Sequence, residues 1–299
     1  MSFLNERQPK PKSSALSQLV SREDYIMVST KALRHALSYG LLLLGSLASP
    51  ANASLMDVTV TIRNLAPANS ISFAPLRLGF GNGTFDSFNI GTTAGAAIVS
   101  IAEGGSGADW FPAFALADPG SVRGSVGGAL LPGQTASNTF TFDTGSASNR
   151  FFTFANMVIP SNDLFLGNDN PMAFPLFNPD GSLAITTITQ TAGQIWDANS
   201  EIADALAAAF LVGGNNSART PENGLIAFDR SELSTYNGLQ TGAGYFFDST
   251  LLPSNAQNIY QISFSSSAAA PEPSTLLLLT TALGLVGFKR GRSRLRKPA

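Results

Sequence analysis

Three acidic side chains stand where predicted strands end, and their types and positions suit a metal ion. Residues 157–168 begin as an apolar strand, turn after Pro160 and place Asp163 at the lip of a sheet. Asp197 and Glu201 follow a second predicted strand and lie close together in the chain. Calcium takes about six to eight oxygen ligands from carboxylates and from backbone carbonyls in loops. We therefore predict a calcium site at one end of the fold, formed by Asp163, Asp197 and Glu201.

The same residue types also have structural uses, because Asp and Asn initiate turns and cap helices. Asp180 precedes a glycine and is better explained as a turn residue. Glu201 could equally be a charge in the first turn of a helix. Asp169 and Asn178 lie between the two acidic segments and could add ligands. The metal prediction therefore depends mainly on the two aspartates that follow strands.

The residue types that are missing exclude several classes of enzyme. The chain has no cysteine, and its one histidine, His35, precedes the predicted domain. A Ser-His-Asp triad, a Cys-His pair and a His-ligated zinc site are therefore excluded from that domain. Glycosidase chemistry remains open, because it needs only a pair of carboxyl groups.

The predicted domain is strongly acidic. Residues 54–270 contain six arginines, no lysine and sixteen Asp or Glu residues, so their net charge is near −10, whereas the whole chain has a formal net charge of −2. Binding to phosphates requires clustered Lys and Arg, so we expect no nucleic-acid partner. Divalent cations are the natural counter-charge for such a surface.

The segments that position these acids are predicted to be β-strands. Residues 58–62 and 139–142 alternate apolar and polar side chains, as half-buried strands do. Residues 150–159 form a long apolar run, which is typical of a central strand buried on both faces. Residues 184–189 and 259–264 are rich in β-branched and aromatic residues. Frequent glycines separate these runs and indicate turns.

This pattern predicts an all-β fold, an antiparallel β-sandwich, with one short helix. The helix candidate is the Ala-rich segment 201–212, which has Asp204 near its start. We assign one domain to residues 54–264 and a linker of small residues to 265–270.

The acidic segments, together with others in the same order, resemble the spondin domain, the module of spondin and mindin that has many bacterial relatives. The resemblance covers about residues 57–264. It is carried by residues 60–67 (VTIRNLAP), 101–105 (IAEGG), 157–168 (MVIPSNDLFLGN), 175–181 (PLFNPDG), 196–201 (WDANSE) and 221–226 (PENGLI).

The resemblance implies a C2-like antiparallel β-sandwich that binds calcium at one end and acts in extracellular adhesion. It implies that Asp163 and Asp197 are calcium ligands, with Glu201 as a weaker third. The chain departs from the family pattern at Asn199 and Ser200, where Gly and Thr are usual, so the turn that aims Glu201 is altered.

The N-terminal segment has the features of a signal peptide. Cations precede an apolar stretch at residues 36–47, and residues 51–53 supply the small-x-small pattern of a cleavage site. We predict that residues 1–53 are removed after Ala53. The polar stretch before Met27 is either an extended n-region or the result of a misassigned start codon.

The C-terminal segment, residues 271–299, has three parts: the tripeptide Pro271, Glu272 and Pro273, an apolar run at 276–288, and a basic end. The run is shorter than the roughly 20 residues that a stable spanning helix needs, and the basic end would stay on the cytoplasmic side. The layout resembles the PEP-CTERM sorting signal of Gram-negative bacteria. An ordinary membrane anchor is the alternative.

The PEP-CTERM resemblance implies export, recognition by an exosortase and removal of the tail after transient anchoring in the inner membrane. We expect a non-enzymatic, calcium-binding adhesion module on the outer surface or in the extracellular matrix. Its partner would be exopolysaccharide or a surface protein or glycan. The alternatives are a carbohydrate-binding module, with Trp110 or Tyr245 as a stacking platform, and a carboxylate-based glycosidase. An isolated Trp is more often a core residue than a platform.

Overall fold

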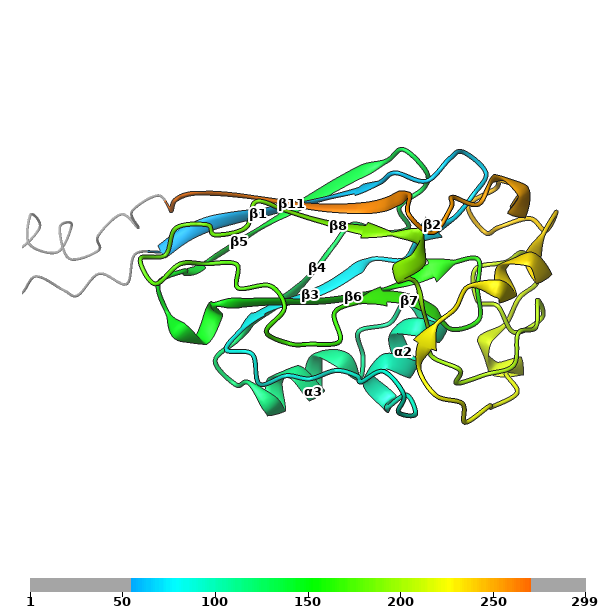
Figure 1. Ribbon diagram of the computed structural model, residues 1–299, viewed down its shortest axis with the longest axis horizontal. Helices are drawn as coiled ribbons and strands as arrows, with labels where there is room; N and C mark the ends of the chain where they lie inside the picture. The colour runs from blue at the N-terminus through cyan, green and yellow to red at the C-terminus, as the bar shows by residue number, and fades with distance from the viewer. Residues whose placement is uncertain (1–54, 270–299) are drawn as a thin grey trace, which may run out of the picture. The chain divides into compact units, whose positions relative to one another are not determined.

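The computed structural model describes residues 55–269 as an all-β antiparallel sandwich, which confirms the predicted fold class (Figure 1). The segments predicted to be a signal peptide (residues 1–53) and a sorting signal with Pro271, Glu272 and Pro273 lie outside the described residues. The first sheet has the strand order β5-β1-β11-β8. Its strands are β1 (Leu55–Asn64), β5 (Thr135–Asp143), β8 (Thr187–Thr191) and β11 (Asn258–Ala268).

The second sheet has the order β10-β9-β7-β6-β3-β4, and β2 also pairs with β6. All of its pairs are antiparallel. Its strands are β2 (Ser72–Phe73), β3 (Leu76–Gly81), β4 (Val122–Val126), β6 (Phe151–Ile159), β7 (Leu164–Gly167), β9 (Trp196–Asp197) and β10 (Ala227–Phe228).

The core lies between the two sheets, and alternation along the strands explains why. Val58, Val60 and Ile62 of β1 are fully buried, while the residues between them are partly exposed. Strand β6 is buried along nearly its whole length, as its apolar run predicts. One face of β6 packs into the core between the sheets, and Ala155 on the other face packs beneath two helices.

These helices, α2 (Ala96–Gly104) and α3 (Trp110–Ala117), cover the outer face of the second sheet (Figure 1). Trp110 is buried between them and the sheet, where it packs against Phe85 and Phe114. It is therefore a core residue and has no exposed face on which a sugar could stack. Residues 55–269 also contain five short 3-10 helices: η1 (Ala147–Asn149), η2 (Ala192–Gln194), η3 (Asn216–Ala218), η4 (Ser231–Tyr236) and η5 (Ser249–Leu251).

The prediction of a helix at residues 201–212 is wrong, because the structure has turns and isolated bridges there. The N–H groups inside this segment do not form the run of bonds to carbonyls four residues back that a helix requires. Leu206 N donates to Asp204 Oδ1 at 2.9 Å, and Val212 N donates to the carbonyl of Gln240 at 2.9 Å. These hydrogen bonds outweigh the helix propensity of the alanines.

The two ends of the described segment lie together. Met56 of β1 pairs with Ala268 of β11, so the pairing reaches four residues into the segment expected to be a linker. Residues 198–257 gather at the opposite end of the sandwich, which we call the loop end (yellow to orange in Figure 1). Within residues 55–269, no helix is long and apolar enough to cross a bilayer.

Candidate functional site

The structure brings Asp163 and Asp197 together at the loop end. Asp163 immediately precedes β7, and Leu164 of β7 pairs with Asp197 of β9. Ala227 of β10 pairs with Asp197 from the other side, so this aspartate sits in the middle of three strands. Ala198 N donates to the carbonyl of Asp163 at 3.2 Å, so Asp163 lies beside Asp197, and the charge of Asp163 raises the pKa of Asp197. The two residues on which the metal prediction depends are therefore neighbours in space.

Asp163 is held rigidly by the loop that follows β9. It is only 1% exposed, and its Oδ2 accepts hydrogen bonds from the backbone N–H groups of Ser200 at 2.6 Å and Glu201 at 3.2 Å. Burial raises the pKa of Asp163, and these donors oppose the rise. The turn before it is closed by Ser161, whose Oγ donates to the carbonyl of Val158 at 2.6 Å.

Asp197 and Glu232 place two more carboxyl groups beside Asp163. Burial and then the charge of Asp163 raise the pKa of Asp197 to about 7. Glu232 lies on η4, and its Oε1 accepts a hydrogen bond from Asn162 N at 3.2 Å. Burial, together with the charges of the two aspartates, raises the pKa of Glu232 to about 9. Sequence reasoning missed Glu232, since it belongs to a polar segment far along the chain that follows no predicted long strand.

Glu201, the third predicted ligand, is buried without a partner. Glu201 is 3% exposed, and neither of its carboxylate oxygens has a hydrogen-bond partner. The side-chain Nδ2 of Asn162 is also buried and unpartnered. Burial and the charge of Glu103 raise the pKa of Glu201 to about 7. A buried carboxylate without donors is unstable as an anion unless a cation or a proton reaches it.

Glu103 and Arg219 form the ion pair beside this cluster. Arg219 Nη2 lies 2.5 Å from Glu103 Oε1 and 3.1 Å from the carbonyl oxygen of Ser200. The Ser200 hydroxyl lies 2.9 Å from Glu103 Oε1 and 3.1 Å from Asp163 Oδ2, and its one proton serves only one of them. Across residues 55–269 this is the only ion pair, so the acids around it outnumber their cations.

The other candidate ligands have local roles. Asp180 is exposed and accepts hydrogen bonds from Ser182 N at 3.0 Å and Ser182 Oγ at 2.6 Å, which confirms it as a turn residue. Asn178 also bonds to Ser182, and Asp169 accepts from Ile90 N at 3.3 Å. The contacts of these three residues are therefore with nearby loops and not with the aspartate pair.

The acidic cluster around Asp163 and Asp197 does not provide a complete set of metal ligands. In the part of the chain that the structure describes, no three acidic side chains are arranged so that they could hold a metal ion as they stand. A calcium ion at the Asp163–Asp197 pair would need further oxygens from backbone carbonyls, from the side-chain amide of Asn162 or from water.

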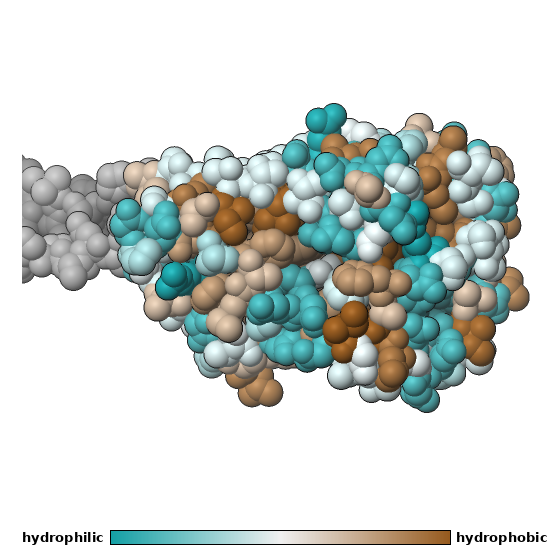
Figure 2. Space-filling view, viewed as in Figure 1, coloured by the Kyte–Doolittle hydropathy of each residue, from teal (hydrophilic) through white to brown (hydrophobic). Residues whose placement is uncertain are grey.

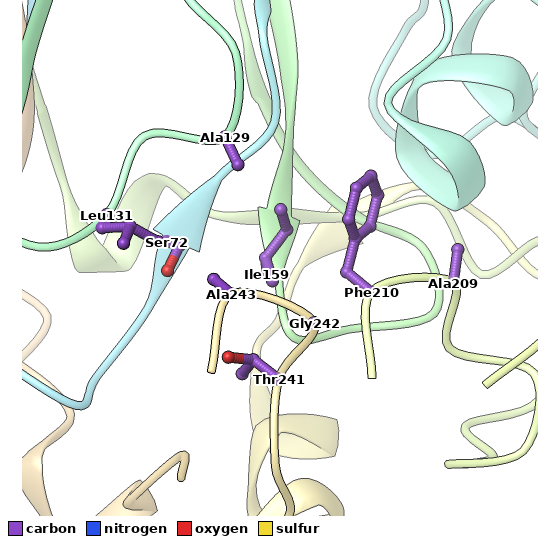
Figure 3. Close-up of a pocket in the computed structure, with 9 residues that line it drawn as sticks. All are labelled: Ser72, Ala129, Leu131, Ile159, Ala209, Phe210, Thr241, Gly242 and Ala243. Atoms are coloured by element: carbon purple, nitrogen blue, oxygen red, sulfur yellow. The ribbon is translucent and has the colours of Figure 1, made fainter. Parts of the chain in front are cut away.

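A separate pocket of about 230 Å³ lies between β2, the end of β6 and two segments of the loop end (Figure 3). Its lining is mostly apolar, with Ile159 and Phe210 among the residues around it. Tyr245 lies beside this region with its hydroxyl donating to the carbonyl of Ser70 at 2.9 Å and contacting Ser72 Oγ. Tyr245 therefore supports the fold here and is not a free stacking platform.

No known protein family matches the chain, and no curated protein matches it.

Proposed function

We propose that the chain is an exported, non-enzymatic binding module of the spondin type whose loop end binds calcium. The observation that carries this proposal is the pairing of Asp163 with Asp197 beside Glu201, a buried carboxylate without hydrogen-bond partners. Calcium is the cation of choice, because the available ligands are oxygens from carboxylates, amides and backbone carbonyls.

The electrostatics of the cluster support a bound cation. Several acids lie close together and are partly or fully buried, so ionising all of them is unfavourable without a counter-charge. Protons supply that charge at low pH, and a divalent cation supplies it at neutral pH. The net charge near −10 of residues 54–270 attracts cations to the surface as a whole.

The topology supports display of the loop end toward a partner. The two ends of the described segment leave from one end of the sandwich, because β1 and β11 pair there. A chain tethered through its C-terminal segment would turn the opposite end, with the acidic cluster, away from the membrane. We propose exopolysaccharide, or a surface protein or glycan, as the partner, and an exosortase as the enzyme that processes the tail on the way to the outer surface or matrix.

The burial of Asp163 argues against a glycosidase. Both carboxyl groups of a glycosidase must reach the scissile bond of the substrate. Asp163 is 1% exposed and engaged with two backbone N–H groups, so it cannot approach a sugar.

Calorimetric titration of residues 54–270 with calcium tests the proposal. We expect the wild type to bind, and we expect Asp163→Asn and Asp197→Asn to lose at least about tenfold in affinity, or about 1.4 kcal/mol. Asp180→Asn is the matched control, because Asp180 is an exposed turn residue, and it should bind as the wild type does. Absence of binding by the wild type, or equal binding by all four proteins, would remove the metal from the proposal.

A further inference from the structure

Phe228 is an exposed aromatic ring on a rigid support. The ring stacks on Trp196 with the centroids 3.7 Å apart and the planes inclined by 23°, yet Phe228 remains 50% exposed. Trp196 is itself fixed, because its Nε1 donates to the carbonyl of Gly167 at 3.0 Å and its ring packs edge-on against Phe88. Trp196 thus covers one face of the Phe228 ring, and the exposed part of the ring is fixed in place in the absence of a ligand. Such preorganisation lowers the entropy lost on binding.

A polar pocket of about 180 Å³ opens beside this ring, between η2 and the end of β10. Asp229, Arg230 and Asn255 contribute to its lining. Arg230 forms no ion pair in the described part of the chain, and its Nη1 is buried without a hydrogen-bond partner. Asp229 Oδ1 accepts from two backbone N–H groups, those of Arg230 at 2.6 Å and Ser231 at 2.8 Å, which leaves Oδ2 available as an acceptor.

We propose that this pocket binds a neutral pyranose ring of a polysaccharide. The C–H groups on one face of such a ring suit the negative face of an aromatic ring, which Phe228 offers. The hydroxyl groups of a sugar both donate and accept hydrogen bonds. They match a donor on Arg230, an acceptor on Asp229, and an exposed amide on Asn255 that does both.

The surrounding charge decides between a neutral and an acidic sugar. Phe228 and Asp229 of this pocket follow Ala227, which pairs with Asp197, so the pocket adjoins the acidic cluster. The net charge of residues 54–270 is near −10, which repels a polyanion. A neutral ring avoids this repulsion and still offers hydrogen-bond acceptors to the guanidinium of Arg230, whose Nη1 has no partner.

This inference rests on the proposed binding function and names the class of its partner, but it uses different residues from the calcium cluster. On the face shown in Figure 2, apolar groups lie scattered among polar side chains. Phe246, another exposed phenylalanine of the loop end, is 61% exposed and has no aromatic ring stacked beneath it in the described residues. It is therefore a matched control for Phe228.

The test titrates the full chain, in a detergent without a sugar headgroup, with cellotriose, maltotriose, mannotriose and trigalacturonic acid. Tryptophan fluorescence reports binding, because the chain has two Trp residues and one of them, Trp196, lies under Phe228. Calorimetry gives a second readout. We expect at least one neutral trisaccharide to bind, with affinity reduced about tenfold or more by Phe228→Ala and by Arg230→Gln. Phe246→Ala should bind as the wild type does.

Three results would overturn the inference: no binding of any neutral trisaccharide, binding that survives Phe228→Ala unchanged, or binding of trigalacturonic acid alone. Calcium titration of the same variants separates this inference from the metal proposal, since Phe228→Ala should keep its calcium affinity. Sugar binding without calcium binding would support the sugar pocket and overturn the calcium proposal. Calcium binding without sugar binding would overturn the sugar pocket alone.

Discussion

At the scale of single residues, the loop end combines buried acids with few cations. Asp163 is satisfied by backbone N–H groups, whereas neither carboxylate oxygen of Glu201 has a partner in hydrogen-bonding geometry, and only the Asn162 side chain and the charge of Arg219 oppose the rise of its pKa. The closeness of Asp163 and Asp197 could be predicted, because each follows a segment whose residue pattern predicts a strand. Glu232 and the Glu103–Arg219 pair could not, because tertiary folding alone joins them to the cluster, and no spacing in the chain marks them.

The raised pKa values predict how stability depends on pH. Burial raises the pKa of Asp197 and of Glu201 to about 7 and that of Glu232 to about 9, all above their ordinary values. The folded state therefore holds these protons more tightly than the unfolded state does. Without calcium, the free energy of unfolding should fall as the pH rises from about 5 through 9.

Urea denaturation of residues 54–270 in EDTA, at several pH values, measures this slope. Glu201→Gln should flatten it, because the substitution removes one of the titrating groups. Saturating calcium should reverse the loss at high pH, where the ligands are ionised. A calcium-free domain that is equally or more stable at pH 8 than at pH 5 would contradict the account.

At the scale of elements, strands β1, β5, β6, β8 and β11 were predicted, whereas the other six strands of the described residues and helices α2 and α3 were not. Period-two alternation identified β1 and β5, and the apolar run identified β6, because sheet burial leaves these patterns in the chain. The Ala-rich segment 201–212 has high helix propensity, but Leu206 N bonds to the Asp204 side chain and Val212 N to the carbonyl of Gln240 instead of to carbonyls four residues back. Helices α2 and α3 were missed. Pro112 does not prevent α3 from forming, because Pro is tolerated in the first turn of a helix.

Helix α3 gives a prediction about the second hydrophobic cluster. Trp110 is fully buried there, so Trp110→Ala should lower the free energy of unfolding by about 3–5 kcal/mol. Leu116 lies on the same helix and is exposed, so Leu116→Ala should change stability by less than about 0.5 kcal/mol. Chemical denaturation of both variants provides the comparison. Equal effects would show that α3 does not pack as described.

At the scale of the whole molecule, the proposed display toward a partner requires that the loop end faces outward from the cell. The chain has no cysteine, so Val212→Cys introduces a single thiol at a residue that is 65% exposed. A membrane-impermeant maleimide should label this variant on intact cells. Ala102→Cys, at a buried position in α2, should label only after denaturation. Labelling of the first variant only in lysed cells would contradict surface display.

The most direct test is a crystal structure of residues 54–270 grown with calcium. We predict anomalous density for one calcium ion at the loop end, with oxygens of both Asp163 and Asp197 at about 2.3–2.6 Å. Density at an unrelated place, or an empty cluster in saturating calcium with the two side chains turned apart, would contradict the central claim.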